Sequence, residues 1–247
     1  MKTLKFSLSN DKLKHIKEWS DIENPKVYSF SLLSGYSCPS AKDCHAYARV
    51  DKVTGKKTLQ DGKHAKFRCF SARDEARLPS VYNQRKHNFD ALLGIKDDYI
   101  DIAILIQESL PKNANFIRVH VGGDFFTKAY MQAWYLVAEK NPNIIFYAYT
   151  KSIKWMSELE YLRPDNFRIT ASYGGKEDAI IDELNLKSAK VVFHPTETNL
   201  PIDHNEYYAI NDEGNFSLLL HGTQKAGSEG SKAISKMIAE GINPNYS

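Results

Sequence analysis

The only cysteines of this 247-residue chain, Cys38, Cys44 and Cys69, lie within a window of 32 residues. Three thiolates that leave one corner open can hold a cubane iron–sulfur cluster that also binds a further ligand. Three cysteines and one histidine can instead hold structural zinc, and His45 and His64 are near in sequence. The intervening segments contain five and then twenty-four residues, so the paired knuckle typical of zinc sites is missing. The spacing leaves an iron–sulfur cluster, a zinc site and three unrelated buried cysteines as open interpretations. A nucleophilic cysteine is a further possibility, but no recognisable base accompanies any of the three thiols.

The composition is that of an ordinary globular protein, with 42% hydrophobic and 26% charged residues. No apolar run approaches the ~20 residues of a membrane span, and residues 1–10 lack the apolar stretch of a signal peptide. We therefore expect a cytoplasmic protein with no membrane partner. Disulfides are rare in a reducing cytoplasm, and an odd number of cysteines cannot all pair within one chain. Metal binding is favoured for that reason.

The net charge of +3 is too small to indicate a nucleic-acid partner by itself. One stretch is nevertheless basic, and it contains Lys52, Lys56, Lys57, Lys63, Lys66 and Arg68. Such a run is most often a solvated surface, and contact with nucleic acid or another protein is the alternative.

The cysteines fall around a predicted strand and a predicted hairpin. Residues 27–33 form a β-rich run that ends at Ser34-Gly35, so Cys38 and Cys44 follow the carboxyl end of a strand. Between Cys44 and Cys69, Gly55 and the Asp61-Gly62 pair are turn signals. The sequence therefore predicts a hairpin insertion at about residues 34–72 that returns Cys69 toward the other two cysteines.

The rest of the chain alternates predicted strands and helices, which is typical of parallel strands joined by crossover helices. The predicted strands are 116–121, 144–150, 167–173 and 191–194, and the predicted helices are 73–94, 98–110, 128–140, 153–161, 176–186 and 228–240. Residues 207–211 and 216–220 are predicted to form a further hairpin. We expect a single α/β domain over residues 1–247: a TIM-like (β/α) barrel that is incomplete or has six to eight strands. A doubly wound sheet is the main alternative.

Polar residues interrupt the predicted strands, where a buried parallel strand is normally apolar. Arg118 and His120 share one face of a strand, and Arg168, Thr170 and Ser172 share one face of another, because side chains alternate with period two. If these faces point inward, they predict a bound ligand or anion, or a structural network that satisfies them. The alternative is that these faces lean toward solvent.

Gly122-Gly123-Asp124 directly follows the strand that carries Arg118. Two adjacent glycines allow a ligand to approach the backbone closely. Asp124 is a candidate ligand contact or fourth cluster ligand, and the alternative is an N-cap for the helix that begins near Thr127. Lys151 and His194 follow later strands at equivalent positions and rank below the cysteines as site residues.

Segments 37–44, 67–72, 118–126 and 223–228 resemble the gene-product-88-like iron–sulfur proteins of bacteriophages. The resemblance implies a radical-SAM-like barrel in the host-cell cytoplasm, with a [4Fe–4S] cluster bound by Cys38, Cys44 and Cys69. The Gly122-Gly123-Asp124 segment sits where radical-SAM enzymes have a Gly-Gly-Glu motif that helps to hold SAM, so SAM is a candidate ligand. The cysteine spacing differs from the usual radical-SAM spacing of three and then two residues.

These observations predict a [4Fe–4S] cluster at the open strand ends, with the fourth iron free or bound by Asp124 or a small molecule. In an enzymatic hypothesis, SAM or a substrate binds that iron and Arg118, His120 and Arg168 hold anionic groups. In a binding hypothesis, the cluster is a redox sensor or structural element and the basic hairpin contacts nucleic acid or protein. A zinc-stabilised protein without redox chemistry is the third hypothesis.

Overall fold

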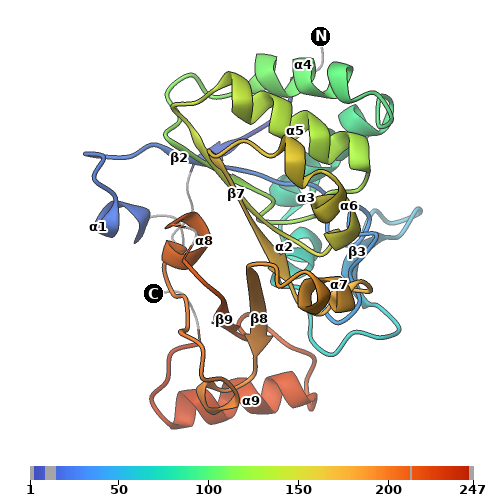
Figure 1. The fold of residues 1–247 in the computed structure, drawn as a ribbon. Coiled ribbons are helices and arrows are strands. Elements are labelled where there is room, and N and C mark those ends of the chain that lie inside the picture. Colours follow the sequence, from blue (N-terminus) through green and yellow to red (C-terminus); the bar gives the residue numbers. More distant parts are fainter. Residues whose placement is uncertain (1–2, 9–14, 212, 245–247) are drawn as a thin grey trace.

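The computed structural model describes residues 3–8, 15–211 and 213–244. Its main element is a seven-stranded sheet in the order β1-β2-β5-β6-β7-β8-β9 (Figure 1). The edge strand β1 is antiparallel to β2, and all other neighbouring strands are parallel. The strands are β1 (Ser7–Leu8), β2 (Val27–Phe30), β5 (Phe116–Val119), β6 (Ile145–Thr150), β7 (Phe167–Ser172), β8 (Ser188–Val192) and β9 (Phe216–Leu219).

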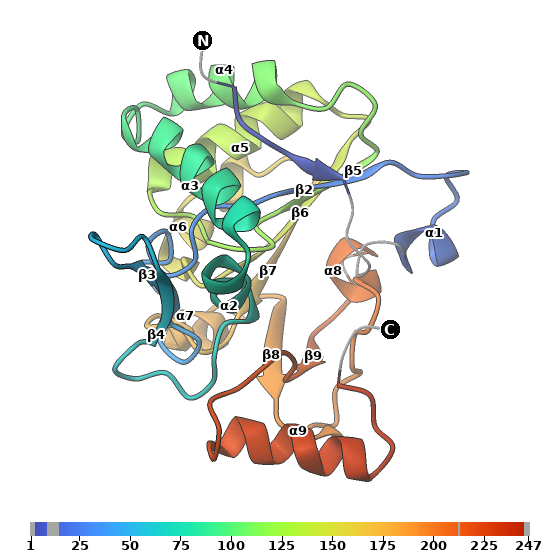
Figure 2. The ribbon, with the colours of Figure 1, turned by 180° about the vertical axis from the view of Figure 1, so that it is seen from behind.

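From β2 onward the parallel strands are added to the sheet in chain order. Right-handed crossovers between such strands put the connecting helices on one face of the sheet, and Figures 1 and 2 show them grouped there. These helices are α3 (Pro79–Leu93), α4 (Tyr99–Ser109), α5 (Lys128–Lys140), α6 (Ile153–Glu158) and α7 (Asp178–Glu183), with the 3₁₀ turn η2 (Glu160–Leu162) after α6. None of the described helices is both long and apolar enough to cross a membrane.

The sheet is open. In the described part of the chain β1 and β9 are its two edges, and no pairing joins them. The prediction of an α/β protein with consecutive parallel strands is confirmed, but a closed barrel is not observed. The doubly wound alternative is wrong, because the strand order then reverses at a switch point and here it runs in one direction.

Each face of the sheet has its own apolar core. On the helix-covered face, Trp134 and Tyr130 of α5 pack with Phe30 and Phe146 of the strands, and all four are fully buried. On the other face, the core includes Ile16, Val27, Phe116, Tyr147, Ala209 and Ile210. This second core comes from the strands, from α1 (Ile16–Trp19) and from α8 (Tyr207–Asn211).

The predicted hairpin between Cys44 and Cys69 is confirmed. Strands β3 (Ala46–Val50) and β4 (Lys57–Asp61) form a separate antiparallel pair that stands away from the main sheet (Figure 2). Gly55 adopts φ +68° in the turn, a conformation that glycine tolerates well. After β4, the amides of Lys66 and Phe67 donate to the Asp43 carbonyl at 2.7 and 3.1 Å, so the chain returns beside Cys44.

The helical segment predicted at residues 73–94 is two helices, α2 (Phe70–Arg77) and α3. Leu78 separates them in an extended conformation, because a residue that precedes proline avoids helical backbone angles. Pro79 then occupies the first turn of α3, where its missing N–H costs nothing.

Residues 207–211 were predicted as a strand, and this prediction is wrong: they form the helix α8. The carboxylate of Asp203 accepts hydrogen bonds from the amides of Asn205 and Tyr208, which fixes the first turn. β9 accordingly pairs in parallel with β8 instead of forming an antiparallel hairpin. The 3₁₀ turn η3 (Pro195–Glu197) follows β8, and the predicted last helix is α9 (Glu229–Ala239), capped by Ser228.

Candidate functional site

A cavity of about 180 Å³ lies between the cysteine loop and the carboxyl ends of the parallel strands. Its volume is several times the ~30 Å³ that one water occupies in the liquid, so it has room for a small group. Its wall includes all three cysteines, the Gly122-Gly123-Asp124 segment, Arg118, His120 and Lys151. Residues from the second face of the sheet, among them Tyr149, Val191 and Leu218, complete it.

The three cysteines are free thiols, each partly exposed. Cys38 lies in the loop after β2, and its Sγ accepts a hydrogen bond from the Gly35 amide at 3.3 Å. Cys69 is the residue immediately before α2. The structure therefore brings to one cavity two segments that the β3–β4 hairpin separates in sequence.

Burial disfavours the thiolate forms of Cys38 and Cys69. The pKa of Cys38 is raised well above its usual value, first by burial and then by the charges of Asp124 and Cys69. The pKa of Cys69 is raised to about 11, first by burial and then by Cys44. Without a bound cation both groups are protonated and weakly nucleophilic at neutral pH. A catalytic thiol is disfavoured for this reason.

Among the described residues, no group of three or more His, Cys, Asp or Glu side chains is arranged to hold a metal ion. The zinc interpretation requires ligands that converge on one ion, with sulfurs about 2.3 Å from it. Neither His45 nor His64 lines the cavity. A [4Fe–4S] cluster has different requirements, because each thiolate binds a different iron and the ligands surround a larger group. Three thiols around one cavity fit the donor set of a cluster in that sense.

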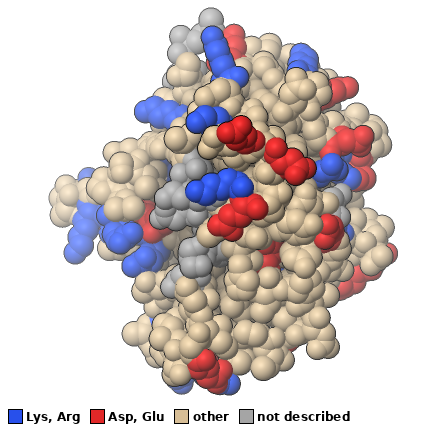
Figure 3. Space-filling model, turned by 90° about the vertical axis from the view of Figure 1, so that its left-hand side faces the viewer, with Lys and Arg blue, Asp and Glu red and all other residues tan. Residues whose placement is uncertain are grey.

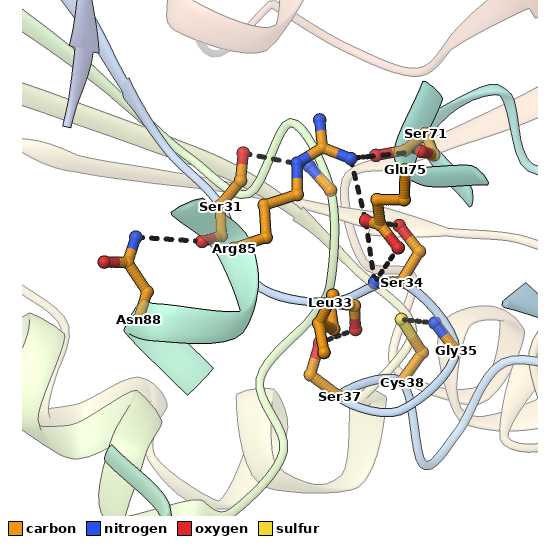
Figure 4. Close-up of polar contacts among 11 residues, drawn as sticks. Ser31, Leu33, Ser34, Gly35, Ser37, Cys38, Ser71, Glu75, Arg85 and Asn88 are labelled. Carbon is orange, nitrogen blue, oxygen red and sulfur yellow. Dashed lines mark hydrogen bonds and ion pairs between the residues drawn. The ribbon is translucent and has the colours of Figure 1, made fainter. Parts of the chain in front are cut away.

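A buried polar network fixes the segments that carry the cysteines (Figure 4). Glu75 of α2 accepts hydrogen bonds from the amide of Ser34 at 3.0 Å and from its hydroxyl at 2.8 Å. Arg85 of α3 donates to the Glu75 carboxylate at 2.7 Å and to the Ser71 carbonyl at 3.0 Å. The network joins the loop before Cys38 to the helix after Cys69. Sequence reasoning missed it, because charged residues in a helical pattern are usually solvent-exposed.

The two glycines after β5 are required by the protein's own packing. A Cβ atom on Gly122 would lie 2.1 Å from Ser71 Oγ, and one on Gly123 would lie 2.6 Å from Ser37 Oγ. Gly123 also has φ +89°. Both glycines line the cavity, but the close approach they allow is to the cysteine loop and α2.

Asp124 is buried and bound by three donors. The Phe125 amide and the Thr150 hydroxyl donate to Oδ1 at 2.7 Å each, and the Lys151 amide donates to Oδ2 at 2.8 Å. The alternative that Asp124 caps α5 is wrong, since Thr127 is the cap. Burial raises the pKa of Asp124 to about 6, although its hydrogen bonds act in the opposite direction. Asp124 thus joins the ends of β5 and β6 at the cavity wall.

Arg118 lies on the second face of the sheet, where it forms a buried ion pair with Glu206. Tyr149 donates to the other oxygen of Glu206 at 3.1 Å, and the Arg118 guanidinium lies over the Tyr149 ring. An acidic side chain of the protein therefore already balances the charge of Arg118. Arg168, by contrast, does not line the cavity.

His120 does not continue the strand alternation that begins at Arg118. It adopts φ +70°, just after the end of β5. Its ring packs against Phe125, and its Nε2 lies 3.0 Å from the Tyr130 hydroxyl. Burial, and then the charge of Arg118, lower the pKa of His120 to about 3, so the ring is neutral.

Comparison with known proteins gives the family of this chain. The model of a protein family described as gene product 88 matches residues 3–238. The chain belongs to the gene product 88 family. It is 25% identical to the Gene 88 protein of Mycobacterium phage L5 over 166 residues, which cover 59% of this chain and 69% of the phage protein. No solved structure was found to match. The resemblance to phage gene-product-88 proteins is confirmed as a family relationship.

Two further polar residues of this gene product 88 protein follow strands at the same edge of the sheet. Lys151 lies directly after β6 and lines the cavity. His194 follows β8 but is not part of the cavity wall, and its ring bonds to Glu240 at 2.7 Å and to Thr196. Equivalent positions in the sequence pattern therefore have different surroundings in the fold.

Proposed function

We propose that this gene product 88 protein binds a [4Fe–4S] cluster through Cys38, Cys44 and Cys69. The observation that carries the proposal is that the chain's only three thiols come from two segments and line one cavity at the carboxyl ends of the parallel strands. Lone thiolates are unfavourable there, and a cationic group bound to them removes the penalty.

Backbone amides near the cysteines support the ligand role. The Gly35 amide donates to Cys38, and the amides of Ser71 and Ala72 lower the pKa of Cys69 through hydrogen bonds. Hydrogen bonds to ligand sulfurs stabilise the thiolate form and are one of the factors that set a cluster's potential. The Glu75 network holds these amides in place, because it binds Ser34 and Ser71 directly or through Arg85.

Three cysteine ligands leave one iron without a thiolate, and the proposal assigns that position to a small molecule from the cavity. Asp124 is a poorer candidate, because both of its carboxylate oxygens already accept hydrogen bonds. A cluster with an open iron supplies electron transfer or Lewis-acid chemistry. The enzymatic form of the proposal, with SAM as the small molecule, predicts 5′-deoxyadenosine when SAM is added to reduced protein.

Metal analysis of protein prepared without oxygen tests the cluster. We expect about four iron and four sulfide per chain and broad absorption at about 400 nm. Cys38→Ala, Cys44→Ala and Cys69→Ala should each lose most of the iron, whereas His64→Ala, which changes a residue outside the cavity, should keep it. Colourless, zinc-loaded protein, or full iron content in any of the cysteine variants, would contradict the proposal.

A second candidate function is binding of nucleic acid by the β3–β4 hairpin. Lys52, Lys56 and Lys63 are exposed on or beside this projecting hairpin, and among the described residues they take part in no ion pair (Figure 2). Lys66 and Arg68, by contrast, pair with Asp43 and Asp61. By contrast with these lysines, the acidic and basic side chains over the upper half of the face drawn in Figure 3 are interspersed. Unpaired lysines on one projection provide the salt-dependent contacts that a phosphate backbone attracts.

A gel-shift titration at several salt concentrations tests this second function. We expect weak, salt-sensitive binding of single- or double-stranded DNA that is lost when Lys52, Lys56 and Lys63 are all changed to Gln. The matched control changes Lys232 and Lys236 of α9 to Gln and should bind as the unmodified chain does. Absence of any shift at low salt would remove this candidate.

A further inference from the structure

Lys151 differs from the other Lys and Arg side chains of the cavity wall. Arg68 is paired with Asp61, and Arg118 is paired with Glu206. Among the described residues, Lys151 takes part in no ion pair. In the described part of the chain, the wall therefore contains one ammonium group that forms no ion pair with an acidic side chain.

The position of this ammonium group is fixed by its surroundings. Lys151 directly follows β6, and its amide is held by the Asp124 carboxylate at 2.8 Å. Its Nζ donates to Ser172 Oγ, at the end of β7, at 2.6 Å. Ser172 is itself buried and lines the same cavity. Two ammonium hydrogens and the Ser172 hydroxyl hydrogen remain as donors for a bound group.

Among the described residues neither acidic residue of the wall forms an ion pair with this ammonium group, although the Asp124 carboxylate and the Lys151 ammonium attract each other electrostatically. Asp124 receives three hydrogen bonds from neighbouring groups, and Glu206 receives bonds from Arg118 and Tyr149. An ammonium group beside a partly enclosed cavity attracts an anion from solution, because little water is available to solvate its charge. A single ammonium group matches the single charge of a carboxylate better than a phosphate, which carries about −1.5 to −2 charges at neutral pH.

The part of the cavity wall that comes from β8 and β9 is apolar. Val191 of β8, Leu218 of β9 and Leu220 line it, and this part of the wall has no charged side chain from those strands. A ligand that fills both parts has an anionic end and an aliphatic body. The volume of about 180 Å³ restricts it to a small molecule.

We propose that the cavity binds a small aliphatic carboxylic acid whose carboxylate lies on Lys151 Nζ and Ser172 Oγ. The acid would lie beside the cysteines, since Asp124 both holds the Lys151 amide and acts electrostatically on Cys38. In this respect the inference rests on the proposed function, because the acid then occupies the cavity of the proposed cluster. Binding itself needs only side chains of this chain.

Calorimetric titration with hexanoate tests the inference, and hexanamide serves as the uncharged probe of similar shape. We expect hexanoate to bind at least about tenfold more tightly than hexanamide, which is the usual effect of a hydrogen bond to a charged group. Lys151→Gln should remove this preference, and Ser172→Ala should weaken it. Lys154→Gln is the control. It changes an exposed lysine of α6, three residues after Lys151, and should leave the preference for hexanoate unchanged.

Lys151→Arg keeps the charge and should retain binding of hexanoate, which separates loss of the ammonium group from a folding defect. Equal affinity for the two probes, absence of hexanoate binding, or unchanged binding by folded Lys151→Gln would each overturn the inference. Iron content is measured on the same preparations. Hexanoate binding without iron would contradict only the proposed cluster, and iron without hexanoate binding would contradict only this inference.

Discussion

Glu75 and Arg85 form a buried ion pair beneath the cysteine loop. Arg85 Nη1 lies 2.7 Å from Glu75 Oε1, and the two side chains are 10% and 0% exposed. Glu75 also accepts two hydrogen bonds from Ser34, and Arg85 donates to Ser71 (Figure 4). The pair thus joins α3 to the segments that precede Cys38 and follow Cys69.

Arg85→Ala should lower the free energy of unfolding by about 3–5 kcal/mol, because it leaves the Glu75 carboxylate buried without its cation. Urea denaturation of the metal-free protein measures the change. Lys86→Ala is the control: Lys86 pairs with Asp90 on the exposed side of the same helix, and this change should cost about 1 kcal/mol or less. Similar small losses in both variants would show that the buried pair does not hold the loop.

Much of the fold was predictable because its strands and helices have strong local patterns. The boundaries of α5 were predicted to the residue, and β6 and β7 to within one residue at each end. The errors arose where distant contacts override local preference. Tyr207 and Tyr208 favour a strand by type, but Asp203 fixes a helical turn there and the sheet buries Ala209.

The candidate site was only partly predictable for the same reason. The clustering of the cysteines and the turn signals between them are local features, and they indicated that the three cysteines come together at one site. The partners of Arg118 and Glu75 come from distant segments, so no sequence pattern showed that the first is balanced and the second is buried. The strand alternation also could not show that His120 adopts a left-handed conformation.

Gly122→Ala should destabilise the protein by about 1–3 kcal/mol or more, since its Cβ would lie 2.1 Å from Ser71 Oγ and 2.9 Å from Arg85 Cζ. Gly94→Ala is a matched control at the end of α3. No atom lies within 4 Å of its added Cβ, and Gly94 has helical angles, so this change should stabilise by about 0.4–1 kcal/mol. Thermal unfolding of both variants distinguishes the effects, and stabilisation by Gly122→Ala would refute the packing role.

Asp203 should make stability depend on pH. Burial, and then the charge of Glu206, raise its pKa from about 3.8 to about 6. The folded state therefore binds more protons than the unfolded state between these values, and the free energy of unfolding falls as pH rises from about 4 to about 6. The contribution is about 3 kcal/mol at most. Asp203→Asn removes the titrating group, so its stability should fall less over this interval. Identical pH profiles for the two proteins would be evidence against the raised pKa.

Arg118 and Lys151 line the same cavity, and their surroundings predict effects on stability of different size. Arg118→Ala leaves Glu206 buried without its cation and should cost about 3–5 kcal/mol. Lys151→Gln removes an ammonium group that has a hydroxyl partner but no acidic one, so it should change stability by about 1 kcal/mol or less. Urea denaturation without added organic acid gives both values. If Lys151→Gln were as destabilising as Arg118→Ala, Lys151 would have a structural role, and its charge would not be available to a ligand.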